Sequence, residues 1–469
     1  MASRKKAVLT PLPRPLRMIR FIAGVIVLGA LTSCARSGGS VQDEYPKLSP
    51  TIEQPGTSTP VITPPPLTPT VAPTLEETIP SPSYDSSTTL DAYVIPLTIQ
   101  HLSETTADLY FMLESPAEGA VYYSLHGNSP DQAKWITFDA ATDTHLIKVS
   151  DLEPGALYEA WVGVSDDAGV LHPPSFADGV WEPVTIRLPQ ENDWPIRVGV
   201  IGDSGFGEEV TYQLAEEMAS HHPELVIHTG DLVYNVYEDP SPAEAFIRKF
   251  YQPLADLLHA APIYPVFGNH EGYEDTYWRD QPFYYAAFPP LENTFRGDDF
   301  GGMSGQRGWY AFRHGDYQFI FLNSQQFYSL DLRQEQNAWL QEKLGGSAST
   351  TNIVVFHIPP FTSGYHPDDG IPIRQAWIPL FEEANVALVL SGHDHNYERL
   401  ELNGITYIVS GGGSNTLYDK RDTREESEFF TAKSHFVILE LFRDRIGMTA
   451  YGLGGEVLDS YTLQNPSSD

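Results

Sequence analysis

The sequence predicts an α/β (α+β) sandwich in which helices flank mixed sheets, preceded by a smaller all-β sandwich. Two observations predict this order. Residues 92–190 consist of short segments of alternating apolar and polar residues separated by turn signals, which is typical of antiparallel sheets. Residues 195–465 instead alternate short apolar segments with longer amphipathic ones, as in layered structures of strands and helices.

The composition is that of a folded, strongly acidic protein. The chain has 469 residues, of which 41% are hydrophobic and 12% aromatic, enough apolar material for two or three domains. Its formal net charge is −34, with a pI of about 4.6. We expect no nucleic-acid partner, because phosphate backbones are bound by clustered Lys and Arg side chains.

The first 33 residues have the layout of a secretory signal, with six basic residues, no acidic ones and an apolar run from Ile19 to Leu31. The only cysteine, Cys34, follows Leu31-Thr32-Ser33, and this ending resembles the lipidation site of bacterial lipoproteins. An ordinary signal peptide or a transmembrane anchor is the alternative, although the apolar run is short for a membrane span. We predict a lipoprotein signal peptide over 1–33 and a mature protein outside the cytoplasm, anchored to the cell membrane by a lipid on Cys34.

Residues 34–91 are predicted to be a disordered tether. They are rich in Pro, Thr and Ser, with eleven prolines between Pro46 and Pro82. Such a composition buries too little apolar surface to fold and forms a semi-rigid spacer.

Residues 92–190 are predicted to be the smaller all-β domain. Its strand-like segments include 107–111, 120–123 and 158–162. The turn at 151–158 (Asp-Leu-Glu-Pro-Gly-Ala-Leu-Tyr) resembles the one before a late strand of fibronectin type III domains. No group of catalytic residue types occurs in this region, so we expect it to pack or to space the neighbouring domain.

Residues 195–465 are predicted to form the second domain. Strands are expected over 197–202, 225–229, 263–267, 309–314, 317–322, 353–357, 386–390, 405–410, 435–442 and 446–452. Helices are expected over 207–221, 243–259 and 333–344, and an aromatic and Gly-rich insertion extends to about Gly308.

Metal-binding residue types follow the ends of five of these strands. Ligands of open α/β sheets bind outside the carboxyl ends of the strands, and carboxylate, imidazole and phenol groups suit Fe, Mn or Zn. Taken singly, the aspartates could cap helices and the histidines could be satisfied by the backbone. Because His393 and His395 are two residues apart in what we expect to be extended chain, both imidazoles should point to one place. The candidate metal ligands are Asp203, Asp231, Tyr234, Asn269, His357, His393 and His395.

The series of motifs resembles the calcineurin-like metallophosphoesterases. It comprises Gly202-Asp203, Gly230-Asp231, Gly268-Asn269-His270-Glu271, His357 and Gly392-His393-Asp394-His395. Tyr234, three residues after Asp231, and Asn396-Tyr397-Glu398-Arg399 resemble the purple acid phosphatase branch. That branch also places a fibronectin-like domain before the catalytic one, so the resemblance covers about residues 92–465.

The resemblance implies a role for each candidate. Asp203, Asp231, Tyr234 and His395 would hold Fe(III), and Asp231, Asn269, His357 and His393 would hold a divalent ion (Fe, Zn or Mn). His270 would steady and protonate the reacting phosphate. His366, nine residues after His357, matches a second catalytic histidine, although Pro367 stands where some family members have a further histidine.

The predicted activity is hydrolysis of small phosphate monoesters by in-line attack of a metal-bound hydroxide. A tyrosine with an ordinary pKa near 10 binds a metal as phenolate only beside a strong Lewis acid, which favours Fe(III) over a second zinc. Two alternatives stay open. The same site could hydrolyse phosphodiesters, or the chain could be a surface binding protein whose second domain is inert.

Overall fold

The computed structural model describes residues 70–71, 83–177, 179–190, 194–272, 281–288, 308–325, 330–345 and 350–465. Cys34, the predicted signal peptide and most of the predicted tether lie outside these residues. The tether prediction is wrong for Thr70–Val71, which pairs with Ile147 and Lys148, and for Tyr84, which forms a β-bridge with Leu171. Within the described part of the chain, no helix combines the length and the apolar character that crossing a bilayer requires.

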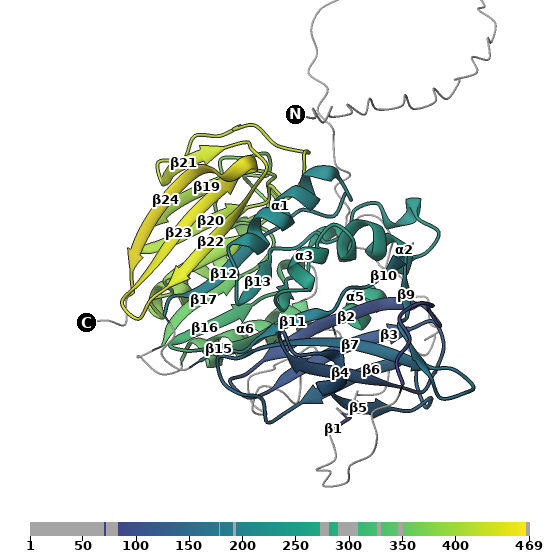
Figure 1. Cartoon of the computed structure of the whole chain (residues 1–469). Coiled ribbons are helices and arrows are strands. Elements are labelled where there is room, and N and C mark those ends of the chain that lie inside the picture. The colour runs from purple at the N-terminus through teal and green to yellow at the C-terminus, as the bar shows by residue number, and fades with distance from the viewer. Residues whose placement is uncertain are drawn as a thin grey trace, which may run out of the picture. The chain divides into compact units, whose positions relative to one another are not determined.

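The N-terminal part is an all-β sandwich, as the alternating pattern predicts. One sheet has the order β1-β6-β3-β2 and the other β11-β7-β4-β5, with β8 paired to β7 and a separate β9–β10 hairpin (Figure 1). The strands are β1 (Thr70–Val71), β2 (Tyr93–Leu102), β3 (Ala107–Leu113), β4 (Gly119–Leu125), β5 (Lys134–Phe138), β6 (Thr144–Val149), β7 (Leu157–Ser165), β8 (Leu171–His172), β9 (Ser175–Phe176), β10 (Gly179–Val180) and β11 (Val184–Arg187).

Strand β7 shows why the pattern forms such a sheet. Tyr158, Ala160 and Val162 are buried, whereas Glu159 and Trp161 between them are only partly buried. Successive side chains of a strand point to opposite faces, so one face of β7 packs in the core and the other faces outward.

The second domain contains two mixed sheets. The six-stranded sheet has the order β14-β13-β12-β22-β23-β24, and β12, β13 and β14 are parallel. Its strands are β12 (Ile196–Ile201), β13 (Leu225–His228), β14 (Ile263–Pro265), β22 (His435–Leu441), β23 (Arg445–Gly452) and β24 (Glu456–Gln464).

The seven-stranded sheet has the order β15-β16-β17-β18-β20-β19-β21, with β16, β17, β18 and β20 parallel. Its strands are β15 (Tyr310–His314), β16 (Tyr317–Phe321), β17 (Thr351–Val355), β18 (Leu388–Ser391), β19 (Tyr397–Leu402), β20 (Ile405–Ser410) and β21 (Ser427–Thr431). Val355 and Leu390 belong to the large core cluster that includes Val198, whereas Val354 packs in a second cluster with Trp377. Burial on both faces explains why these strands are continuously apolar.

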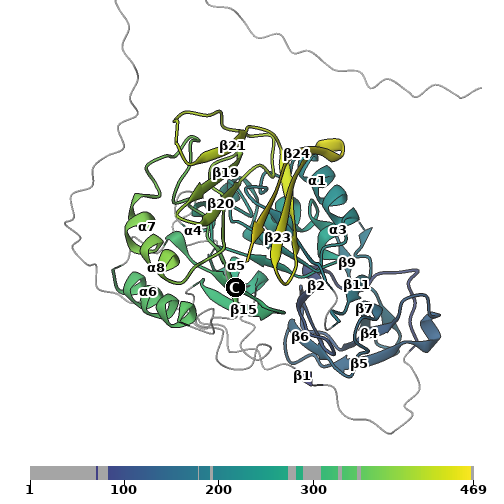
Figure 2. The same cartoon turned by 90° about the vertical axis from the view of Figure 1, so that its left-hand side faces the viewer.

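Helices cover the outer faces of the two sheets. Figure 2 shows α6, α7 and α8 on one side of this domain and α1 and α3 on the other. The helices are α1 (Glu209–Ser220), α2 (Pro242–Phe246), α3 (Ala255–Leu258), α4 (Asn269–Gly272), α5 (Gln281–Ala287), α6 (Leu330–Leu344), α7 (Ile371–Ala376) and α8 (Ile378–Glu383).

The single helix expected over 243–259 is wrong. The segment is instead α2, a π-helical turn over Ile247–Tyr251, and α3. Pro253 interrupts it, because proline lacks the N–H of the helical ladder and clashes with the preceding turn. The sequence prediction also missed three antiparallel strands. β21 and β24 are largely exposed or partly exposed, and β19 is half buried but carries three charged residues, so none of them is a compact apolar run.

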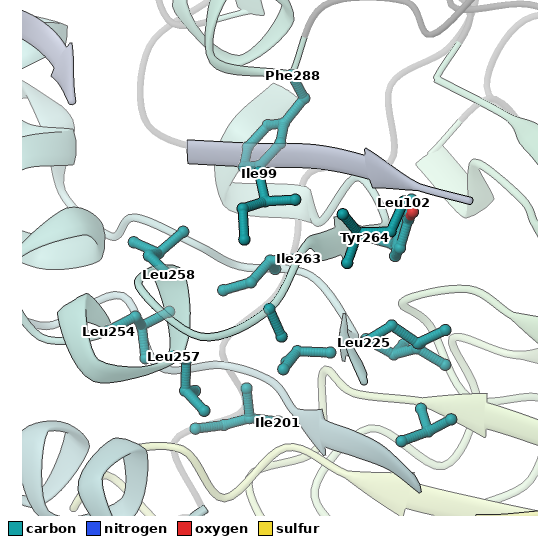
Figure 3. Close-up of a cluster of buried hydrophobic side chains, with 14 of the residues drawn as sticks. Ile99, Leu102, Ile201, Leu225, Leu254, Leu257, Leu258, Ile263, Tyr264 and Phe288 are labelled. Atoms are coloured by element: carbon teal, nitrogen blue, oxygen red, sulfur yellow. The ribbon is translucent and has the colours of Figure 1, made fainter. Parts of the chain in front are cut away.

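The all-β sandwich and the second domain share an apolar core. Figure 3 shows Ile99 and Leu102 of β2 beside Ile263 and Tyr264 of β14. The hydroxyl of Tyr264 lies 3.0 Å from Nδ1 of His101. The sandwich therefore packs against the strand that leads to Asn269, in agreement with the packing role expected of it.

Candidate metal centre

The five strand ends predicted to carry metal ligands meet at one edge of the paired sheets. Asp203 follows β12, Asp231 follows β13, Asn269 follows β14, and His357 follows β17. His393 and His395 follow β18. Asp203 and Asp231 both have a φ of 55°, a left-handed conformation at the sharp turn out of the strand.

The first cluster contains Asp203, Tyr234 and His395. The hydroxyl of Tyr234 lies 3.2 Å from Oδ1 of Asp203 and 3.0 Å from Nε2 of His395. His395 Nε2 is 3.5 Å from the same Asp203 oxygen. These buried oxygen and nitrogen atoms can surround a single cation.

The second cluster contains Asn269, His357 and His393. Oδ1 of Asn269 lies 2.8 Å from Nε2 of His357 and 2.9 Å from Nδ1 of His393. Oδ1 of Asp231 is 3.4 Å from the same nitrogen of His357. Asp203, Asp231 and His357 also offer ligand atoms that all lie within 4.8 Å of one another, so Asp231 is positioned to serve both clusters.

Backbone carbonyls orient two of the histidines. Nδ1 of His357 lies 2.9 Å from the carbonyl oxygen of Thr229, and Nδ1 of His395 lies 2.7 Å from that of Thr416. A carbonyl only accepts hydrogen bonds, so each Nδ1 carries a proton, and Nε2 is the nitrogen that faces the cluster and would bind a metal. This second contact is the usual way to hold a metal-binding imidazole.

The expectation that His393 and His395 point to one place is wrong. His393 faces Asn269, whereas His395 faces Tyr234 in the other cluster. The physical reason is the backbone, because His393 has a φ of 69° and the segment is not extended. The pair therefore divides between two neighbouring clusters.

Two glycines allow the ligand loops to approach closely. A Cβ atom on Gly268 would lie 2.1 Å from Oδ1 of Asp231, and one on Gly392 would lie 2.4 Å from Oδ2 of Asp203. Both distances are far below van der Waals contact, so only glycine fits.

The carboxylates are buried without a Lys or Arg partner among the described residues. Burial raises the pKa of Asp203 well above its usual value. Burial opposes ionisation of Asp231 too, but His357 and His270 outweigh it and lower the pKa of Asp231. Burial alone would lower the pKa of His357, yet Asp231 and Asp203 raise it to about 10. Without a metal, protons on Asp203 and His357 thus compensate the buried negative charge. Bound metal cations can replace these protons. The donor set fits two such ions.

The two candidate catalytic histidines lie beside these clusters. The ring of His270 is 4.3 Å from that of Tyr234, and the backbone N–H of His270 donates to Oδ1 of Asp231 at 3.0 Å. The ring of His366 is 4.4 Å from that of His393, and its Nδ1 is 3.3 Å from Oδ2 of Asp369. The structure therefore brings together all nine residues singled out in the sequence.

Sequence reasoning gave no role to three acidic residues that hold this arrangement. Oδ2 of Asp369 is 3.0 Å from Nε2 of His393 in addition to its contact with His366. Oδ1 of Asp394 accepts the backbone N–H groups of Tyr365 and His366. Asp394 and Glu271 stand inside the quoted motifs, but only the folded contacts show what they do.

Glu271 links the loop of Asp231 to the loop of Asn269. Its carboxylate accepts the backbone N–H groups of Asp231 at 3.0 Å, Leu232 at 2.6 Å, Val233 at 3.1 Å and Gly268 at 2.9 Å. Burial and the nearby Asp231 raise the pKa of Glu271 to about 7.

Comparisons with known proteins find similar sequences and a similar fold. Residues 196–397 match the family model of calcineurin-like phosphoesterases. Purple acid phosphatase 23 of Arabidopsis thaliana is 27% identical over 336 residues, which cover 65% of this chain and 69% of that protein. Purple acid phosphatase 5 of the same plant is 30% identical over 237 residues, 49% of this chain and 51% of that protein.

The fold is similar to that of purple acid phosphatase PPD1 from yellow lupin (Lupinus luteus), with a TM-score of 0.60 at 17% identity over 80% of this chain and 74% of that one. Residues 196–397 are thus similar in sequence to calcineurin-like phosphoesterases, and the fold agrees with this similarity. Its fold and its purple acid phosphatase relatives indicate a phosphoester hydrolase.

We predict that Glu271→Gln weakens metal binding about 10- to 100-fold, because residues that orient ligands contribute on that scale. Glutamine keeps the shape but offers one acceptor oxygen in place of two to the four N–H groups. Metal affinity is measured by competition with a chelator. Glu244→Gln, on the exposed start of α2, is the matched control. Equal affinity in both variants would contradict the role of Glu271.

Proposed function

We propose that the chain is a dimetal-dependent phosphatase of the purple acid phosphatase type that hydrolyses phosphate monoesters. The observation that carries the proposal is the pair of ligand clusters with Asp231 between them. One carboxylate placed to bridge two cations is the arrangement used for in-line displacement at phosphorus.

Each cluster fits one ion. Asp203, Asp231, Tyr234 and His395 would hold Fe(III), and Asp231, Asn269, His357 and His393 would hold Fe, Zn or Mn in the divalent state. Two bound ions would polarise the phosphoryl oxygens and lower the pKa of bound water. The phenol suits Fe(III), because burial raises the pKa of Tyr234 well above its usual value and only a strong Lewis acid would ionise it.

Two histidines supply hydrogen bonds and protons. His270, half-buried beside Tyr234, would donate to an oxygen of the reacting phosphate. His366 is oriented by Asp369 through Nδ1, which leaves Nε2 to protonate the departing alcohol oxygen. Pro367 supplies no second imidazole, so in this scheme His366 would act alone as the general acid.

The rest of the chain would place this site outside the cytoplasm. The proposed order is a signal peptide over 1–33, a lipid on Cys34, a tether over 34–91, a fibronectin type III-like domain over 92–190 and the catalytic domain over 195–465. The two sheets formed by residues 92–190 support the assignment of the fibronectin type III-like domain.

We predict that the purified protein contains two metal ions and releases phosphate from a monoester faster than from the matching diester. His357→Ala should lose about one equivalent of metal, since one cluster is opened. His366→Ala should keep both ions and slow turnover by about 10²–10⁴-fold if it is the general acid. Elemental analysis and phosphate release measure these outcomes.

Full metal occupancy in His357→Ala would contradict the ligand assignment. Faster turnover of the diester would show that the protein is a phosphodiesterase and not a phosphomonoesterase. A metal-loaded wild type inactive on both esters would favour a binding protein.

We predict that the iron-loaded, oxidised protein is coloured, because a phenolate on Fe(III) gives a charge-transfer band. Tyr234→Phe should remove the visible band and leave some hydrolysis. Tyr110→Phe, a buried tyrosine of β3, is the control and should stay coloured. An active, iron-loaded wild type without visible absorption would exclude the phenolate ligand.

We predict that Cys34→Ala abolishes lipid attachment and releases the protein from the membrane fraction. The measurement is partition between detergent and aqueous phases, together with the mass of the N-terminal peptide. A variant that still partitions and migrates like the wild type would show that the thiol carries no lipid.

A further inference from the structure

A stack of side chains leads outward from the candidate metal centre. The ring of Tyr418 stacks on His395 at 4.3 Å with only 7° between the ring planes. The ring of Tyr365, which is 42% exposed, lies 5.0 Å from Tyr418 and 4.9 Å from His366. The guanidinium carbon of Arg421 lies 3.3 Å above the ring of Tyr365. Two ring contacts therefore separate Arg421 from His366.

The backbone fixes both ends of the contact between Arg421 and Tyr365. The N–H of Arg421 donates to the carbonyl of Ser363 at 2.8 Å. The N–H of Ser363 donates in turn to the buried Glu398 at 2.7 Å, and that of Tyr365 to the buried Asp394 at 2.9 Å. Arg421 is thus held by a main-chain bond and by its ring contact rather than left free to rotate.

Arg421 differs from the other cations near this loop. Arg424 is 3.7 Å from a carboxylate oxygen of Glu426, and Arg374 donates to the carbonyl of Pro367. Lys420 reaches Ser427 of β21. Among the described residues, no carboxylate lies within ion-pair distance of Arg421. Unlike Arg424, Arg374 and Lys420, Arg421 has no hydrogen bond or ion pair from its side chain to another described residue, and its guanidinium contacts the ring of Tyr365.

We propose that Arg421 forms a second anion subsite, so that the preferred substrates are phosphate esters whose leaving group carries another anionic group. This inference rests on the proposed phosphatase function. A planar guanidinium lying flat on a ring still presents N–H groups at its edge, and these match the two oxygens of a carboxylate or phosphate. The reacting phosphate would lie at the clusters, the leaving oxygen at His366, and the second anion beyond it at Arg421.

The local charges make such a subsite useful. Asp369 lies beside His366, and Asp419 and Asp422 flank Lys420 and Arg421 in the sequence. Without Arg421 these acidic groups would repel a substrate with two anionic groups. A single fixed cation among them would therefore decide whether such a substrate binds.

The test compares two esters with the same carbon skeleton. Glycerol 3-phosphate has a neutral leaving group, and 3-phosphoglycerate has a carboxylate in place of one alcohol. We expect the wild type, loaded with metal, to show a kcat/KM about tenfold higher for 3-phosphoglycerate, since charge-assisted contacts near solvent contribute on that scale. Arg421→Gln should lower the ratio of the two values to one or below, mainly by raising KM for 3-phosphoglycerate.

Two further variants separate this role from a structural one. Lys420→Gln removes the same charge from the adjacent residue and should keep the ratio of the wild type. Arg421→Lys keeps the charge but not the planar fork, so an intermediate ratio is expected. A bisphosphate of propane-1,3-diol as a third substrate shows whether the subsite takes a second phosphate, a carboxylate or both.

Equilibrium binding gives a readout that does not depend on turnover. The phosphonate analogues of the two matched esters are titrated into the metal-loaded protein by calorimetry, and Arg421→Gln should reduce their affinity ratio as it reduces the kinetic one. A wild-type ratio near one, or equal ratios in the wild type and Arg421→Gln, would overturn the subsite. The absence of metal-dependent phosphate release from every ester would instead overturn the proposed function.

Discussion

The constraint on which the rest depends is the burial of two carboxylates at the edge of the paired sheets. Asp203 and Asp231 have almost no exposed surface and no Lys or Arg partner among the described residues. Such charges are tolerated in a protein only when a cation, hydrogen bonds or protons compensate them. The surrounding atoms are imidazole, phenol and amide groups, which bind metals. The strain at the two aspartates, the need for glycine at 268 and 392, and the network around Glu271 all serve this one arrangement.

The sheets solve the problem of bringing distant residues together. Parallel strands have their carboxyl ends on the same edge, so each strand that joins the sheets adds one loop to the site. Asp231 and His357, more than 120 residues apart, thereby come within 3.4 Å. Continuously apolar strands keep the edge rigid, because β17 and β18 are buried on both faces. The chemistry thus lies in loops, while their positions are set by the core.

Much of the site could be predicted from the sequence because its residues stand at ends of recognisable strands. The alternation of strands and helices was enough to predict four ligands at strand ends: Asp203, Asp231, Asn269 and His357. The division of His393 and His395 between two clusters was implied by the family resemblance but not by their spacing, since it depends on a left-handed backbone at residue 393. Asp369, Tyr418 and Arg421 lie in irregular loops whose contacts arise only on folding. The half-exposed strands β21 and β24 were missed for a similar reason, because their pattern is too weak to separate from loop.

The packing of β2 against β14 has a consequence for the history of the chain. Ile99 and Leu102 contribute to the same core as Ile263 and Tyr264, and Tyr264 stands five residues before Asn269. The two domains therefore share a core, and recombination could not exchange one of them independently of the other. A foreign β domain inserted before residue 195 would need a matching apolar face, or the metal loop would lose its support. A lineage that changed the N-terminal domain would have had to change the apolar faces of β2 and β14 together. Substitutions at residues 99 and 263 should therefore be correlated among related sequences.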